Sequence, residues 1–155
     1  MSGKNHSQRS LVLVKPDALA RGIAGHIINR LSHAHLRIVG AKAVRVNKDL
    51  AEEHYKHLKD KPFFPELIDF IQGKLHGEEN SIILALVYEG EDCIRRIRDI
   101  AGATNPEQAS PKSLRGQYGR ITTKGVMENV IHASSDPQEA EREIRLWFKS
   151  DEIAR

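Results

Sequence analysis

The chain has 155 residues, of which 29% are charged and 5% aromatic, and its formal net charge is +3. This length suits one domain that can bury a real core, and the composition is that of a globular protein with an aliphatic core. The small positive charge favours polyanions, but no basic block interleaved with aromatic residues marks a nucleic-acid surface. We therefore expect a single domain over residues 1–155, with its core at about residues 10–150.

Cysteine content and the N-terminal segment predict the compartment. The single cysteine, Cys93, cannot form an internal disulfide, which favours a reducing environment. The polar residues 1–9 lack the apolar core of a signal peptide, and no apolar run approaches the ~20 residues of a membrane span. We therefore expect a cytoplasmic protein.

The first elements in chain order are strands that alternate with helices. Residues 10–14 form a continuous apolar run, which is typical of a strand buried on both faces. Apolar residues then recur at helical spacing over residues 23–31. Residues 36–46 are rich in β-branched and small apolar residues and predict a second strand, and a helix is expected from residue 49 to about residue 58.

Two prolines then interrupt the pattern. Pro62 and Pro65 restrict the residues before them, so they predict a hinge between two helices. Residues 66–71 predict a brief amphipathic helix, and the polar, glycine-containing residues 73–80 predict a loop.

The next segments are a strand, a helix and a long irregular stretch. Residues 81–88 predict a strong third strand, and residues 91–100 a helix with acids at its start and arginines towards its end. Residues 101–123 contain several glycines and prolines and only a short helical pattern at residues 111–114. A loop of this length inside a compact domain usually has a function.

The chain ends with a short strand, a histidine and a helix. Residues 130–131 predict the strand, and residues 137–148 a helix with Asp136 as its N-cap and Glu139 as a capping-box acid. His132 then lies at the strand end beside a helix start, where free backbone N–H groups attract anions. This place suits phosphate chemistry, although a lone histidine there is more often an ordinary half-buried side chain.

The order of these elements predicts an α+β fold of βαββαβ type. In this plan the strands at residues 36–46 and 81–88 pair, and they belong to a four-stranded antiparallel sheet with helices packed on one face.

Five short motifs follow one another in order along residues 10–150. They are VKPDA at 14–18 with RG at 21–22, HY at 54–55 with KPFF at 61–64, GATNP at 102–106, LRG at 114–116, and NVIHAS at 129–134. In order and spacing they resemble the nucleoside diphosphate kinase family. One such motif is a weak signal, whereas five in order over nearly the whole chain are specific.

The resemblance implies a ferredoxin-like βαββαβ sandwich and an enzyme. It implies reversible ping-pong transfer of the γ-phosphoryl group from a nucleoside triphosphate, typically ATP, to a nucleoside diphosphate, through a phosphohistidine at His132. Ser134, Glu143 and Lys15 match the other catalytic positions. The matches to nucleotide-binding positions are Lys15, Tyr55, Phe63, Arg98, Thr104, Arg115, Val126 and Asn129.

These residue types suit phosphoryl transfer. Neutral imidazole is available as a nucleophile near pH 7, and guanidinium and ammonium groups hold phosphate oxygens. Glu143 can face His132 from the terminal helix and fix the tautomer of its ring, and Phe63 offers a platform on which any base stacks. Outside the motifs, the ordinary interpretations would be solvated surface for the basic residues, core for Tyr55, a loop cap for Thr104 and a surface ion pair for Glu143.

Histidine spacing and the family resemblance predict the metal and the partners. The histidines show no zinc-like spacing, and His54 and His57 at helical spacing predict surface positions, so we assign no protein metal ligand. Mg²⁺ is expected, held mainly by substrate phosphates and water. The resemblance further implies nucleoside di- and triphosphates as partners and a homo-oligomer, either a tetramer or a hexamer, with residues 101–123 as candidates for subunit contacts.

Some positions depart from the family pattern and motivate alternatives. Residues 72–81 and 117–128 are longer than usual, Glu128 replaces a basic residue, and Ala133 replaces a glycine. The second hypothesis is therefore a non-catalytic nucleotide- or nucleic-acid-binding scaffold of the same fold. A protein histidine phosphotransferase is a third, and it would need a protein acceptor that the sequence does not identify.

Overall fold

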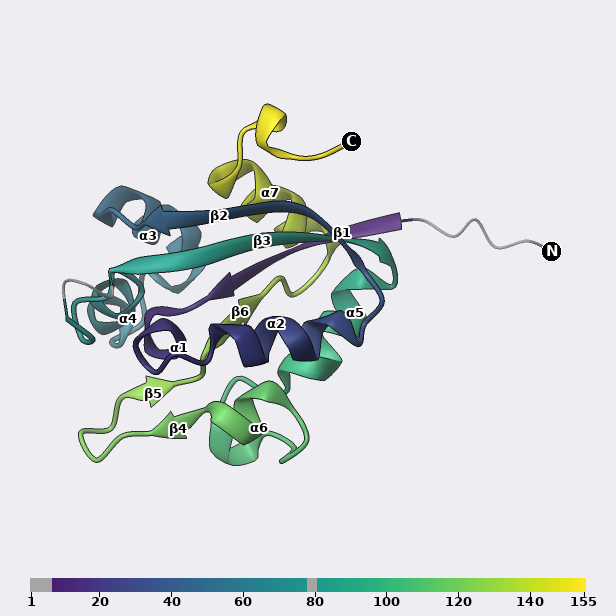
Figure 1. Cartoon of the computed structure of the whole chain (residues 1–155). Coiled ribbons are helices and arrows are strands. Elements are labelled where there is room, and N and C mark those ends of the chain that lie inside the picture. Colours follow the sequence, from purple (N-terminus) through teal and green to yellow (C-terminus); the bar gives the residue numbers. More distant parts are fainter. Residues whose placement is uncertain (1–6, 78–80) are drawn as a thin grey trace.

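A four-stranded antiparallel sheet organises the chain (Figure 1). The computed structural model describes residues 7–77 and 81–155, so part of the expected loop at residues 73–80 lies outside the described residues. The strand order is β2-β3-β1-β6. The strands are β1 (Ser7–Val14), β2 (Arg37–Arg45), β3 (Ile82–Glu91) and β6 (Ile131–Ala133).

The central strand β1 explains why the sheet has this order. Leu11, Val12, Leu13 and Val14 are all completely buried, as a strand covered on both faces requires. β1 pairs with β3 along its full length and with β6 over three residues, where Leu13 is opposite His132. β2 pairs with β3, as predicted for residues 36–46 and 81–88.

Helices cover both faces of the sheet rather than one. One face carries α1 (Pro16–Ala20), α2 (Ala24–Ser32), α5 (Cys93–Ala101) and α6 (Leu114–Tyr118), and the other carries α3 (Lys48–His54), α4 (Phe64–Ile71) and α7 (Pro137–Trp147). Alternate residues of β1 enter the two cores: Val12 packs with the first set, and Leu13 with the second. The expectation of a single covered face is wrong because the apolar run in β1 needs cover on both sides.

Short 3-10 turns occur at Lys56–Leu58, Pro106–Gln108 and Ser150–Glu152. A hinge does separate α3 from α4, but it ends at Phe63, because Pro65 is tolerated in the first turn of α4 rather than preceding it. In the part of the chain that the structure describes, every helix is too short or too polar to cross a membrane.

The stretch 101–123 is more regular than the sequence suggests. The helix expected at residues 111–114 instead begins where that prediction ends, because the Ser113 hydroxyl caps α6 by accepting from the N–H of Gly116 at 3.1 Å. A hairpin of β4 (Arg120–Ile121) and β5 (Met127–Glu128) follows. Strands of two residues are too short to show any periodicity, so the sequence did not predict them.

Candidate active site

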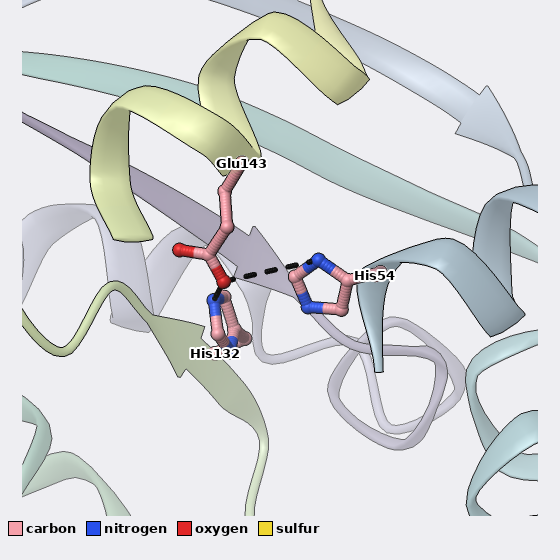
Figure 2. Close-up of side chains that lie close together, drawn as sticks. All are labelled: His54, His132 and Glu143. Carbon is pink, nitrogen blue, oxygen red and sulfur yellow. Dashed lines mark ion pairs between the residues drawn. The ribbon is translucent and has the colours of Figure 1, made fainter. Parts of the chain in front are cut away.

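His132 lies in the middle of β6, and Glu143 reaches it from α7 (Figure 2). The His132 Nε2 atom is 2.7 Å from Oε2 of Glu143, and that carboxylate is only 3% exposed. This close contact is not a hydrogen bond in the structure, and catalytic hydrogen bonds are often poorly aligned before substrate binds. Glu143 engages Nε2, so Nδ1 is the ring nitrogen left for chemistry.

The charge of Glu143 reflects two opposing effects. Burial alone would raise the pKa of this carboxyl, but its contacts with His132 and Ser134 outweigh burial and hold the pKa below its usual value. Ser134 is completely buried, and its hydroxyl also accepts a 3.0 Å hydrogen bond from the N–H of Leu11 on β1. A full negative charge therefore faces the His132 ring at neutral pH, within a framework fixed to the central strand.

The start of α7 is not the open anion site expected beside His132. Asp136 caps this helix: its carboxylate accepts from the N–H of Glu139 at 2.8 Å. The helix start is therefore already occupied by a negative charge of the protein. The Glu139 carboxylate does not complete a capping box, because it accepts a 2.9 Å hydrogen bond from Arg142. His132 also lies inside β6 rather than at its end. An anion beside His132 would therefore have to be held by groups from other motifs.

A strained turn at Val130 leads into β6. Its φ is 62°, which is rare for a β-branched residue, and the N–H of Ile131 donates to the carbonyl of Asn129 at 2.7 Å across the turn. The N–H of Val130 donates to Oδ2 of Asp17 at 3.0 Å, and its carbonyl accepts from the N–H of Lys15 at 2.9 Å. Contacts with the first motif thus hold the turn, as expected of strain stored at a functional site.

Lys15 is a buried cation that joins three of the motifs. Its Nζ donates to Oδ1 of Asn129 at 2.8 Å, and the Nδ2 of Asn129 donates to the carbonyl of Thr104 at 3.0 Å. Burial lowers the pKa of Lys15 to about 8, with Asp17 opposing the shift and Arg115 adding to it. The interpretation of Lys15 as solvated surface is therefore wrong.

Arg115 is also buried, at the other side of β6. Its two terminal nitrogens donate to the carbonyl oxygens of Gly102 and Ile131, each at 2.8 Å. Burial, with a contribution from Arg98, lowers the pKa of Arg115 to about 10, so the group stays charged at neutral pH. Arg98 itself is exposed in the last turn of α5. Arg115 therefore braces the strand that carries His132, while Arg98 faces solvent.

The other predicted nucleotide-binding residues lie at different depths. Tyr55 is 6% exposed, and burial raises its pKa, so its phenol keeps the proton that it could donate to a phosphate. Phe63 is 50% exposed at the N-cap of α4, as a stacking platform requires, whereas Phe64 packs on the core. Val126 lies in the turn that joins β4 to β5.

The sequence places His54 on the surface beside His57, but the structure buries it. His54 is 1% exposed, and its ring stands edge-on to that of His132, with centroids 4.6 Å apart. Its Nδ1 lies 3.8 Å from Oε2 of Glu143 (Figure 2). Helical spacing alone did not show which face of α3 packs inward, although Ala51 and Tyr55, four residues apart, mark the buried side.

Three of these groups could also hold a metal ion. The possible ligand atoms of His54, His132 and Glu143 lie within 4.8 Å of one another, and two imidazoles with one carboxylate are a set that zinc accepts. A metal there would occupy the groups that surround the proposed nucleophile. Lys15 and Arg142 also place positive charge towards His54, which opposes another cation. These charges disfavour a metal ion at the cluster.

The longer segment before β6 is fixed by Glu128. This buried carboxylate pairs with Arg120 across the hairpin, with Nε 2.5 Å from Oε2, and with Nε2 of His76 at 3.0 Å from Oε1. Burial would raise the pKa of Glu128, but both partners together hold it below its usual value. Glu128 thus ties the β4–β5 hairpin to the segment that follows α4.

Comparison with known proteins assigns the chain to a family. A family model described as nucleoside diphosphate kinase matches residues 8–153. The chain belongs to the nucleoside diphosphate kinase family. A nucleoside diphosphate kinase of Symbiobacterium thermophilum is 48% identical over 141 residues, which are 91% of this chain and 87% of that protein. One from Pyrococcus furiosus is 43% identical over 96% of this chain and 88% of that protein.

Solved structures of nucleoside diphosphate kinases share the fold. The Halobacterium salinarum enzyme in complex with CDP is 39% identical, with a TM-score of 0.85 over 97% of this chain and 93% of that one. The structure of the Borrelia burgdorferi enzyme is a transition-state mimic with bound vanadate and ADP. That chain is 34% identical, with a TM-score of 0.85 over 96% of this chain and 91% of that one. The predicted family, its ferredoxin-like α+β fold and its class of phosphotransferases are confirmed.

Proposed function

We propose that this member of the family is an active nucleoside-diphosphate kinase whose phosphoryl carrier is His132. It would pass the γ-phosphoryl group of a nucleoside triphosphate, typically ATP, to a nucleoside diphosphate. The observation that carries the proposal is the 2.7 Å contact between Nε2 of His132 and the buried Glu143 carboxylate. A carboxylate on one ring nitrogen fixes the tautomer and leaves the other nitrogen with its lone pair free.

The transfer proceeds in two steps, first to His132 and then to the nucleoside diphosphate. In the first, Nδ1 of His132 attacks the γ-phosphorus, an N–P bond forms, and the bond between that phosphorus and the bridging oxygen breaks as the diphosphate leaves. The ring gains positive charge, with its proton still on Nε2, and Glu143 stabilises that charge. In the second, a terminal oxygen of another nucleoside diphosphate attacks the phosphorus and the N–P bond breaks. Such a loose transfer depends on positioning and charge more than on covalent work by the protein.

The surrounding residues divide the remaining tasks in this proposal. Lys15 and Arg98 hold phosphate oxygens, and Arg115 keeps β6 in place while adding charge. The hydroxyl groups of Tyr55 and Thr104 donate hydrogen bonds to phosphate oxygens. The other contacts proposed are Asn129 with the ribose and phosphates, Phe63 and Val126 with the base, and Ser134 with Glu143.

Mg²⁺ fits this site as an ion bound to substrate. Three buried carboxylates near the site already have protein partners: Glu143 contacts His132, Asp17 accepts from Val130, and Glu128 pairs with Arg120. One oxygen of Asp17 and one of Glu143 have no hydrogen-bond partner among the described residues. Because each carboxylate already contacts a protein group through its other oxygen, the ion would be held mainly by phosphate oxygens and water. When bound, it supplies charge that neutralises the transferred group.

We further propose a cytoplasmic homo-oligomer, a tetramer or a hexamer, built from single domains over residues 1–155. Residues 101–123 remain the candidate for subunit contacts. Mass measurement in solution by light scattering would separate the two assemblies, and a monomer would remove this part of the proposal.

An exchange assay tests the activity. Wild-type protein with ATP, GDP and Mg²⁺ should form GTP, and His132→Ala should not. Nucleotide binding without any GTP formation by wild-type protein would favour the scaffold hypothesis. Salt-sensitive DNA binding would support its nucleic-acid form.

A further inference from the structure

His54 is a buried histidine that touches the proposed nucleophile and has no role in the steps above. It ends α3, and its ring stands edge-on to that of His132 at an interplanar angle of 80°, with centroids 4.6 Å apart. Its backbone carbonyl accepts a 3.1 Å hydrogen bond from Arg142 on α7. Both the backbone and the ring of His54 are therefore held in place.

A neighbouring indole fixes the tautomer of His54. The Nε1–H of Trp147 donates to Nδ1 of His54 at 3.1 Å, and an indole N–H can only donate, so Nδ1 carries no proton. Burial, and next the neighbouring His132, lowers the pKa of His54 well below its ordinary value, so the ring is neutral near pH 7. A neutral imidazole with a bare Nδ1 carries its proton on Nε2.

The Nε2–H group of His54 lacks an acceptor among the residues that the structure describes. Nε2 is buried, and no described residue forms a hydrogen bond with it. A buried donor without a partner is costly and in a native structure requires an explanation. In Figure 2 the edge of the His54 ring that carries Nε2 faces His132. His132 cannot itself be the partner through Nε2, because that atom contacts Glu143.

Phosphorylation of His132 would supply the missing acceptor. It places three charged oxygens on Nδ1, next to a ring whose centroid is 4.6 Å from that of His132. We propose that the Nε2–H group of His54 donates a hydrogen bond to the phosphoryl group carried by His132. The inference rests on the proposed function, and it adds His54 to the residues that touch the transferred group.

Two amide variants separate this role from simple packing. His54→Gln can place an N–H near the position of Nε2 but loses the acceptor for Trp147, whereas His54→Asn can keep an acceptor near Nδ1 but has nothing at Nε2. If His54 binds the phosphoryl group, His54→Asn should slow phosphorylation by ATP about 10- to 100-fold, as expected for a lost hydrogen bond to a charged group. His54→Gln should stay within about threefold of wild type.

The opposite order of rates would show that the bond from Trp147 matters instead, and would overturn the proposal. Equal rates in the two variants, whether normal or reduced, would also overturn it. Wild-type protein is phosphorylated first in the same assay, so failure of the proposed function would appear there, before any variant is compared.

A second measurement needs no variant that could misfold. In wild-type protein with ¹⁵N-labelled histidine, the Nε2 resonance of His54 should show a bound proton and should shift when His132 is phosphorylated. The Nδ1 resonance should shift much less, because Nδ1 keeps its hydrogen bond from Trp147. A proton on Nδ1, or an Nε2 signal that ignores phosphorylation, would contradict the proposal.

Discussion

Lys15 and Asn129 are 114 positions apart in the chain, yet a 2.8 Å hydrogen bond joins the Nζ of Lys15 to Oδ1 of Asn129. The bond connects the segment after β1 to the segment before β6, so the first and last motifs meet beside His132. It also keeps an ammonium group in a buried place, where burial lowers its pKa to about 8. The charge that the proposed phosphate site needs therefore titrates close to neutral pH.

This shift predicts a pH dependence of kcat/KM. The pKa of Lys15 is lowered from 10.5 to about 8, so the free enzyme loses the charge as pH rises through about 8, and kcat/KM should fall there. Bound phosphates favour the ammonium form, so kcat should persist to higher pH. Lys15→Arg stays charged throughout, and its lower kcat/KM should lack this limb. The same fall of kcat/KM with pH in wild type and Lys15→Arg would show that a group other than Lys15 titrates.

Glu143→Gln should slow phosphorylation of the enzyme while leaving nucleotide affinity nearly unchanged. The lost interaction with a charged ring is worth about 1.5–3 kcal/mol, or roughly 10- to 150-fold in rate. The matched control is Glu139→Gln, one turn earlier on α7 and paired with Arg142, which should stay within about twofold. Rapid-quench measurements compare them, and equal losses would mean that the negative charge of α7, not the contact with His132, matters.

Asp17→Ala should destabilise the fold. Asp17 is completely buried, and its carboxylate accepts from the strained Val130 amide at 3.0 Å. Removing it leaves that N–H buried without an acceptor, which should lower the free energy of unfolding by about 2–4 kcal/mol. Asp99→Ala, on the exposed side of α5 near Arg95, should change it by less than about 0.5 kcal/mol. Urea denaturation tests this, and a loss for Asp17→Ala no larger than the control's would refute it.

Glu128→Ala should loosen the β4–β5 hairpin. The carboxylate pairs with Arg120 and His76, so its loss should speed hydrogen exchange of the hairpin amides. Val126 lies in the connecting turn, so KM for nucleotide should rise more than kcat falls. Lys124→Ala, an exposed change in the same turn, is the control. Unchanged exchange in Glu128→Ala would show that the hairpin does not depend on these pairs.

Phe63→Ala tests the stacking platform. Phe63 is 50% exposed, and loss of base stacking costs about 1–3 kcal/mol, so KM should rise roughly 5- to 150-fold for purine and pyrimidine nucleotides alike. The control is Leu75→Ala, which removes another exposed apolar side chain, 46% exposed. A large change in kcat, or a KM effect confined to one kind of base, would contradict a stacking role.

Much of the fold followed from local patterns. The apolar run of β1, the β-branched residues of β2 and the start of α7 at Pro137 each carry a signal within a few residues. The hairpin of β4 and β5 was missed because its strands are too short to be periodic. The cover on the second sheet face was missed because helix periodicity does not say which side of a sheet a helix will join.

For the site, motif order named the candidate residues but not their surroundings. The burial of Lys15 and the use of Arg115 on backbone carbonyls depend on tertiary contacts between distant segments. The same holds for His54, whose partners Trp147 and His132 are far along the chain. The local signal for the burial of His54 is limited to Ala51 and Tyr55, which mark the inward side of α3 but do not show what His54 contacts.

The most direct test of the account is isolation of the phosphoenzyme. Wild-type protein incubated with [γ-³²P]ATP and Mg²⁺ should carry an acid-labile label on His132 that any nucleoside diphosphate removes as the triphosphate. His132→Ala should carry none. A label of normal amount in His132→Ala, or a wild-type label that nucleoside diphosphates do not discharge, would contradict His132 as the phosphoryl carrier.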